Sequence, residues 1–182
     1  MTVLARLKGQ VFADYHQFYI VDGGSWDARS PDTDTSNPEF WSKEAFGLGL
    51  AVLPAVLGVG TASYGTVTVV VEVADARPSL VVADFDRVAE ASLHLASGAL
   101  QVIGCTTPDS LEVGGLQAGW YRVIVCSSRL DLGVESGEGG DHYAVWMWPE
   151  PPTPAMAVKR YTYPPFNVTR RDDEHEGALI AL

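Results

Sequence analysis

Histidines, cysteines and serines are the residues most able to carry acid–base or nucleophilic chemistry in this sequence. His16, His94 and His142 each lie inside an apolar segment of the kind that forms strands. A nucleophile needs a base within hydrogen-bond reach, but the chain has no Gly-x-Ser-x-Gly motif, and neither Cys105 nor Cys126 lies in the context of a known nucleophile. The sequence therefore predicts no catalytic residues, and a Ser–His or Cys–His pair assembled by the fold stays open.

Phosphate, metal and cofactor motifs are also lacking. Residues 58–65 are glycine-rich but lack the Gly-Lys-Ser/Thr of a phosphate loop, so their glycines indicate turns. The histidines show no metal-binding spacing, and residues 32–34 begin like a calcium loop without its glycine or closing glutamate. The acidic run at 172–176 is typical of a solvated tail. We expect no metal site and no cofactor.

One polar segment combines aromatic and acidic residues in a way that no core-forming period explains. An aromatic side chain among carboxylates is typical of a binding loop, since aromatics dominate contact energy and acids steer a basic partner. The predicted partner-binding residues of this segment and the residues after it are Trp26, Asp27, Asp32, Asp34, Glu39 and Trp41. The alternative is that Trp26 folds back onto its own domain.

The charge balance favours a protein partner over nucleic acid or a membrane. The 182 residues include 12 basic and 23 acidic side chains, for a formal net charge of -11. Such a field repels phosphates and anionic lipid surfaces, so we expect neither direct nucleic-acid binding nor membrane binding. It favours a basic protein or serves solubility alone.

The elements that must position these residues are mostly strands. Residues 11–21 predict a central strand, and residues 39–46 predict a short helix that starts near Pro38. Residues 48–61 predict extended chain broken by Pro54, hence an edge strand or a bulge.

Valine at 67, 69, 71 and 73 has period 2 and predicts a strand with those valines in the core. Residues 80–85 predict another strand. Residues 91–96 and 99–104 flank Ser97-Gly98 and predict a hairpin that pairs Leu95 with Leu100 and Leu93 with Val102. Three further strands are predicted at residues 110–113, 120–126 and 142–148, the last two flanking a long loop at 127–141.

This pattern predicts a mainly all-β fold, an antiparallel β-sandwich of about eight strands with one short helix. We expect one domain over residues 1–165 and a weakly ordered tail over 166–182. Cys105 and Cys126 lie in predicted strands and should be buried thiols, bridged only if those strands are neighbours. Residues 1–10 do not resemble a signal peptide, and the apolar region 46–59 is too short and broken to span a bilayer, which predicts a cytoplasmic protein.

An ordered set of short segments resembles the bacterial competence protein J family, described as inhibitors of a DNA-entry nuclease. The segments are Tyr15-His16-Gln17-Phe18, Trp41-Ser42-Lys43-Glu44-Ala45, Val82-Ala83-Asp84-Phe85, Gly98-Ala99-Leu100-Gln101-Val102 and Gly119-Trp120-Tyr121-Arg122-Val123. The resemblance spans roughly residues 10–128 and implies a cytoplasmic β-sandwich that binds protein. The loop after residue 21, the loop at 127–141 and the chain after Pro149 depart from the family pattern. No catalytic residue follows from it.

The leading hypothesis is therefore a non-catalytic inhibitor that binds a nuclease or another toxin through its acidic surface. The alternative is a small-ligand binder or hydrolase with a pocket between the sheets, where His16 or His142 would meet a carboxylate or thiol. A structural module is a third reading that the sequence neither supports nor excludes.

Overall fold

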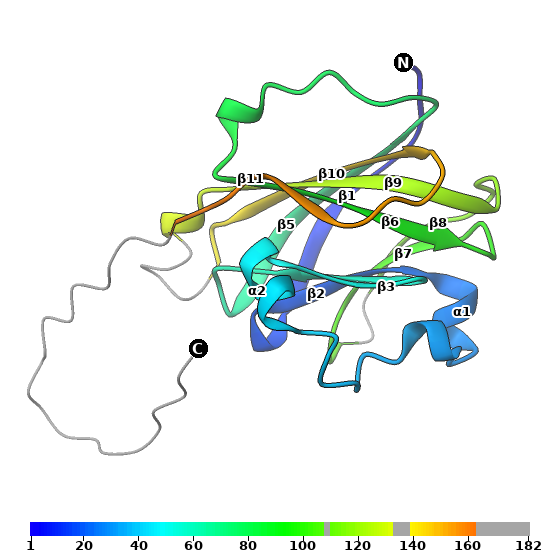
Figure 1. The fold of residues 1–182 in the computed structure, drawn as a ribbon, viewed down its shortest axis with the longest axis horizontal. Helices are drawn as coiled ribbons and strands as arrows, with labels where there is room; N and C mark the ends of the chain where they lie inside the picture. Colours follow the sequence, from blue (N-terminus) through cyan, green and yellow to red (C-terminus); the bar gives the residue numbers. More distant parts are fainter. Residues whose placement is uncertain (108–109, 133–138, 163–182) are drawn as a thin grey trace, which may run out of the picture.

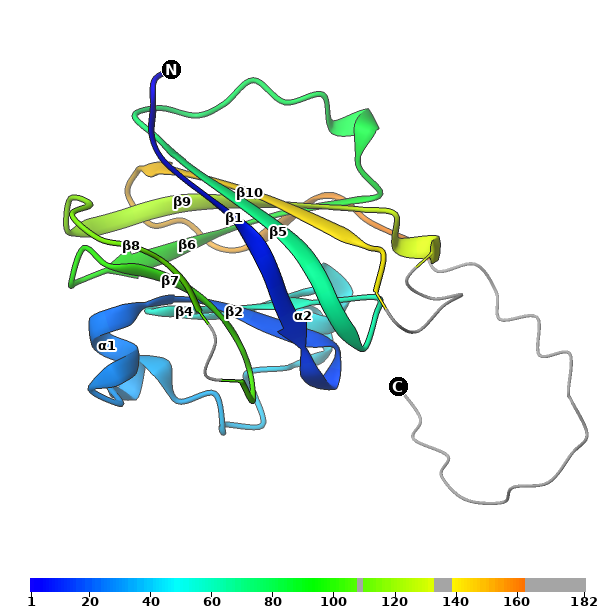
Figure 2. The ribbon, with the colours of Figure 1, turned by 180° about the vertical axis from the view of Figure 1, so that it is seen from behind.

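Two β-sheets face each other and enclose one hydrophobic core in the computed structural model (Figures 1 and 2). The structure describes residues 1–107, 110–132 and 139–162. The predicted tail over 166–182 lies outside these residues. No helix in the described part of the chain is both long and apolar enough to cross a membrane. The predicted β-sandwich is confirmed.

The larger sheet, sheet A, contains six strands. In spatial order they are β1 (Val3–Ala13), β5 (Gly65–Ala74), β10 (His142–Pro149), β9 (Gly119–Ser128), β6 (Arg87–Leu95) and β11 (Met156–Lys159). All neighbours are antiparallel except β5 and β10, which run parallel and depart from the purely antiparallel sheet that was predicted.

Sheet B has five strands, all paired antiparallel. Their order is β3 (Leu50–Leu53), β4 (Val56–Gly60), β2 (Gln17–Asp22), β7 (Leu100–Gly104) and β8 (Ser110–Val113). β3 lies at the edge, as Pro54 predicted. Pro54 and Ala55 form the turn to β4, where the missing N–H of proline costs no ladder bond.

Short helical segments lie in the connections. They are η1 (Asp14–His16), α1 (Gly23–Asp27), η2 (Pro31–Thr33), α2 (Lys43–Leu48) and η3 (Val82–Asp84). The helix predicted over 39–46 begins later because Ser42 supplies its cap: Ser42 Oγ accepts the N–H of Ala45 at 3.2 Å. It ends at Gly49, whose φ of 65° is left-handed.

The core between the sheets follows the predicted alternation. Val67, Val69, Val71 and Val73 on β5 are all buried, as predicted. Val145 and Met147 on β10 point into the same core, while Trp146 and Trp148 lie on the outer face of sheet A in a second apolar cluster with Val88, Ile124 and Cys126.

Three predicted elements were wrong. The strand expected over residues 11–21 is two strands in different sheets, because the chain turns at η1 between β1 and β2. Residues 80–85 form a loop with η3 rather than a strand. The glycines at 58 and 60 lie in strand β4 and not in a turn.

The predicted hairpin around Ser97-Gly98 was also wrong. β6 belongs to sheet A and pairs with β9 and β11, whereas β7 belongs to sheet B and pairs with β2 and β8. The turn therefore crosses from one sheet to the other, and the predicted partners Leu95 and Leu100 both belong to the core between the sheets instead of pairing across a ladder.

Candidate functional site

The six residues predicted to bind a partner lie in residues 23–48, which cover the outer face of sheet B. This segment carries α1, η2 and α2. In Figure 1 the chain around α1 and after it lies below the sheet, and α2 lies beside the strands at the level of the sheet. Side chains from β2, β3, β4 and β7 form an apolar cluster beneath it, separate from the core between the sheets. The polar loop predicted at 25–38 lies within this connection, and the structure shows that Trp26, Phe40, Trp41 and Ala45 pack against the apolar cluster.

Asp22 fixes the start of this segment. Its buried carboxylate accepts hydrogen bonds from the N–H and hydroxyl of Ser25, at 3.0 and 2.6 Å, and caps α1. It also accepts from the N–H and hydroxyl of Ser97, at 3.0 and 2.5 Å. Burial alone would raise the pKa of this carboxyl, but the hydrogen bonds from Ser25 and Ser97 outweigh it and lower the pKa below 3.8.

Aromatic rings anchor the rest of the segment to the sheet. Trp26 lies 5.6 Å from Tyr19, and Phe40 lies 6.2 Å from the same ring. Trp41 packs against Phe40 and donates its indole N–H to the side chain of Gln17. Both tryptophans are half-buried, so the alternative that Trp26 folds back onto its own domain describes its position.

The glycine-rich strand β4 makes this packing possible. A Cβ on Gly58 would lie 2.9 Å from the Phe40 ring and 3.1 Å from Trp41, closer than side chains normally approach. Gly60 also faces Trp41, at 3.5 Å. The two glycines thus give the rings of Phe40 and Trp41 room on the sheet, a role that their spacing in the sequence did not reveal.

The predicted acidic residues all lie exposed on this covering segment. They are Asp27, Asp32, Asp34 and Glu39. Glu44 is exposed as well, and the only basic residues between 23 and 48 are Arg29 and Lys43. Five acids against two bases leave this segment with a formal charge of −3.

A shallow hollow of about 600 Å³ opens within the segment. Trp26, Arg29 and Asp34 line it together with residues 30, 31, 33, 35 and 36. Trp26 and Asp34 are thus brought to one place, whereas Asp27, Asp32, Glu39 and Trp41 do not line the hollow.

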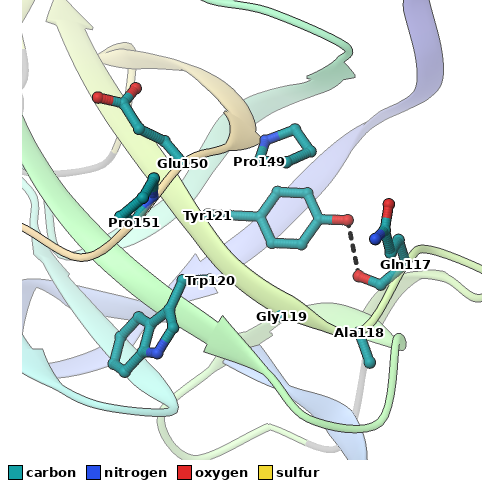
Figure 3. Close-up of a pocket in the computed structure, with 8 residues that line it drawn as sticks. All are labelled: Gln117, Ala118, Gly119, Trp120, Tyr121, Pro149, Glu150 and Pro151. Carbon is teal, nitrogen blue, oxygen red and sulfur yellow. Dashed lines mark hydrogen bonds between the residues drawn. The ribbon is translucent and has the colours of Figure 1, made fainter.

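A second hollow of about 350 Å³ lies where β9 begins and β10 ends (Figure 3). Tyr121 donates its hydroxyl to the carbonyl of Gln117 at 2.8 Å, and Trp120 extends away from that ring (Figure 3). Glu150 is the one carboxylate in the lining, and it accepts the indole N–H of Trp148. The Tyr121 hydroxyl and the Glu150 carboxylate are therefore already engaged within the protein.

The candidate bases pack against other rings and cations. The ring of His16 lies 5.9 Å from Tyr64, that of His94 lies 4.9 Å from Trp120, and His142 Nε2 lies 3.3 Å from Arg129 Nη1. None of these three histidines hydrogen-bonds a serine, a cysteine or a carboxylate of the described residues.

Both cysteines are free thiols. Burial raises the pKa of Cys126 to about 12, so its thiol stays protonated and unreactive at neutral pH. Within the described part of the chain, no three His, Cys, Asp or Glu side chains are grouped to hold a metal ion.

One unusual feature escaped the sequence analysis. Tyr15 and His16 in η1 have φ of 51° and 57°, a left-handed backbone that costs bulky residues about 1–3 kcal/mol each and that concentrates at functional sites. The only sequence signal is Asp14, a turn-forming residue inside an otherwise apolar and aromatic run. At Ser97-Gly98 the chain passes from sheet A to sheet B, and the local sequence there does not distinguish such a connection from a hairpin turn.

Comparison with known proteins shows a shared fold. No protein-family model and no curated protein matches the sequence. Among solved structures, ComJ from Bacillus subtilis, an inhibitor of the DNA-degrading activity of NucA, matches with a TM-score of 0.56 at 12% identity over 79% of this chain and 95% of ComJ. A protein described as crocagin biosynthetic gene J matches with a TM-score of 0.56 at 18% identity over 83% of this chain and 100% of that chain. The ComJ-like fold implied by the sequence resemblance is confirmed.

Proposed function

We propose that this protein binds and inhibits a nuclease through the acidic segment 23–48. The observation that carries the proposal is the fold that the chain shares with ComJ, whose described role is to inhibit the nuclease NucA. The likeness covers 95% of ComJ and 79% of this chain at 12% identity, so it supports a shared fold. The contact surface is argued from this chain's own residues, because the loop after residue 21 departs from the family pattern. The same comparison supports a protein as the partner.

Charge supports this function. A nuclease holds its substrate in a cleft that attracts phosphates, and an acidic protein surface is attracted to the same cleft. The net charge of -11 speeds the encounter, and the exposed carboxylates of segment 23–48 supply the local contact.

The residues divide into two roles within the proposed surface. Asp27, Asp32, Asp34 and Glu39 are exposed and meet the partner directly. Trp26 and Trp41 are half-buried and hold the segment on sheet B, with Trp26 also offering one wall of the 600 Å³ hollow. We place this activity in the cytoplasm, where Cys105 and Cys126 stay reduced.

The test measures DNA degradation by purified NucA and by a cell extract of the native host, with and without the protein. We expect at least one of the two activities to fall at low salt and to recover as salt rises, each rate being compared with the uninhibited rate at that salt. The variant Asp27→Lys/Asp32→Lys should need about ten-fold more protein for half-inhibition, because like charges then face the cleft. Neither carboxylate has a hydrogen bond or ion pair within the described residues, so the fold should be unaffected.

The control is Asp75→Lys/Asp84→Lys, which makes the same change of charge in the loop over sheet A, on the opposite side of the sandwich (Figure 1). Asp75 accepts the backbone N–H of Thr2 at 2.7 Å, so urea denaturation of this variant first establishes that the loss of that bond leaves it folded. It should inhibit nearly as well as the unaltered protein at moderate salt. Undiminished degradation in both the NucA and the extract assays would refute nuclease inhibition. Equal loss in the two double variants would refute segment 23–48 as the contact surface.

A further inference from the structure

Two connections that run from one sheet to the other lie together at one end of the sandwich. Three aromatic rings on or next to these connections are exposed. Residues 14–16 connect β1 to β2, and residues 61–64 connect β4 to β5, beside the paired ends of β1 and β5 (Figure 2). Phe12, Tyr15 and Tyr64 are 37%, 71% and 48% exposed. We name these three residues, with Asp14 and His16, the aromatic corner.

Two ring pairs of the corner, both including Tyr64, stand edge to face. Tyr64 lies 5.9 Å from Phe12 at an interplanar angle of 85° and 5.9 Å from His16 at 70°. Exposed tyrosines are enriched at the contact centres of protein interfaces, because each buries a large area at little cost in side-chain entropy. Single exposed apolar residues are ordinary on a surface, whereas a group of aromatic rings around one turn marks an interaction site.

A carboxylate lies among these rings. Asp14 accepts the hydroxyl of Thr106 at 2.5 Å and the N–H of Tyr15 at 3.0 Å. Hydrogen bonds from Thr106 and Tyr64 lower the pKa of Asp14, so it is ionised at neutral pH. No lysine or arginine of the described residues forms an ion pair with it, so its charge is available to a partner.

Hydrogen bonds to neighbouring parts of the chain hold the backbone of the corner in place. The carbonyl of His16 accepts the N–H of Thr61 at 2.8 Å, and the carbonyl of Asp14 accepts the thiol of Cys105 at 3.1 Å. Buried Asp141 anchors the second crossing, accepting the Ser63 hydroxyl at 2.5 Å and the Ala62 N–H at 2.9 Å. These bonds fix the left-handed backbone of η1 and present the rings without further ordering on binding.

We propose that the aromatic corner binds an arginine side chain presented by a protein partner. A guanidinium stacks on the faces of tyrosine and phenylalanine and pairs with a carboxylate, and the corner offers both within one turn. The net charge of -11 selects for a basic partner rather than an acidic one. This site is separate from segment 23–48, and it does not depend on the partner being a nuclease.

The test uses the whole protein and short capped peptides as probes. Acetyl-Gly-Arg-Gly-amide is titrated to about 20 mM, a range that suits a single exposed contact, while aromatic NMR resonances are followed. We expect saturable shifts at Phe12, Tyr15 and Tyr64. The peptide with citrulline, which keeps the shape of arginine without its charge, should shift these resonances at least five-fold less at equal concentration.

Variants identify the groups responsible. Tyr15→Ala removes the most exposed ring, and alanine tolerates the left-handed backbone better than tyrosine, so the fold should persist. We expect it to reduce arginine binding by several-fold and Asp14→Asn to reduce it further. Val81→Ala, at an apolar residue that is 64% exposed on the loop over sheet A, should leave binding unchanged.

Three outcomes would overturn the proposal. They are the absence of shifts at the corner with the arginine peptide, equal shifts with the citrulline peptide, and undiminished binding in both Tyr15→Ala and Asp14→Asn. None of these depends on nuclease inhibition, so the two proposals fail or succeed separately.

Discussion

At the scale of single residues, a few buried polar side chains decide where the surface segments lie. Asp22 is fully buried, yet its carboxylate oxygens are satisfied by four hydrogen bonds from Ser25 and Ser97. One carboxylate therefore joins the start of the acidic segment to the crossing between β6 and β7. Removing its charge should weaken the hydrogen bonds that hold the start of the acidic segment and the connection between β6 and β7.

We expect Asp22→Asn to lower the free energy of unfolding by about 2–3 kcal/mol at pH 7, because the amide nitrogen cannot accept the bonds that a carboxylate oxygen accepts. Urea denaturation measures the loss. Asp27→Asn is the matched control: this carboxylate is exposed and has no hydrogen bond to the described residues, so it should change stability by less than about 0.5 kcal/mol.

The stability difference between the unaltered protein and Asp22→Asn should depend on pH. The pKa of Asp22 is lowered in the folded protein, so the stability it adds is complete above its ordinary value of 3.8 and is lost as the pH falls through the lower folded pKa. The difference in unfolding free energy between the unaltered protein and Asp22→Asn should stay constant from pH 7 to 5 and shrink toward pH 3. A difference that grows on acidification would contradict the assigned role.

At the scale of elements, the period-2 patterns were predictable and the partners of each strand were not. The valines of β5 and the apolar residues of β10 showed their buried faces in the sequence. The Ser97-Gly98 turn looked like a hairpin because Leu95 and Leu100 have the same alternation whether they pair along a ladder or lie in two sheets around one core. Local sequence fixes the alternation of side chains, but long-range pairing selects the sheet.

For the candidate surface too, some features were predictable from local sequence and others depended on long-range packing. The exposed acids of segment 23–48 were identified from composition, since charged residues in a polar connection stay in water. The roles of Gly58 and Gly60 were hidden, because only the folded chain brings residues 40 and 41 over β4. The aromatic corner was hidden for a similar reason: residues 14–16 and 64 meet only once both crossings have formed.

A buried ionic network joins β6, β9 and the chain that leads to β11. Glu90 is 3% exposed and accepts from Arg122 Nε at 3.1 Å, while Arg122 also donates to the carbonyls of Thr153 and Pro154 at 2.9 and 3.2 Å. Arg77 approaches the same carboxylate from solvent, with its side chain 55% exposed.

We expect Glu90→Gln to destabilise the protein by about 3–5 kcal/mol, because it leaves the buried charge of Arg122 without its counter-charge. Arg77→Gln should cost less than about 1 kcal/mol, since an exposed partner of an ion pair contributes little. Thermal and urea unfolding of both variants test this. Similar losses in the two would mean that Arg122 is neutralised by other means.

At the scale of the whole molecule, the charge of -11 acts on a partner before any contact forms. Long-range attraction depends on net charge and is screened over about 10 Å at 0.1 M salt, whereas the bonds of the complex depend on local charges and are screened less. The two double variants described above both change the net charge by +4, from −11 to −7. They therefore separate steering from contact.

With a nuclease that the protein inhibits, we expect association rate constants to fall by about ten-fold or more between low and high salt, as for other steered pairs. Both Asp27→Lys/Asp32→Lys and Asp75→Lys/Asp84→Lys should associate more slowly than the unaltered protein at low salt and converge with it at high salt, because both lose the same net charge. Only Asp27→Lys/Asp32→Lys should also dissociate faster, because its lysines lie within the proposed contact. Stopped-flow measurement of both rates separates the effects. Faster dissociation of the Asp75/Asp84 variant would move the contact surface to the opposite sheet.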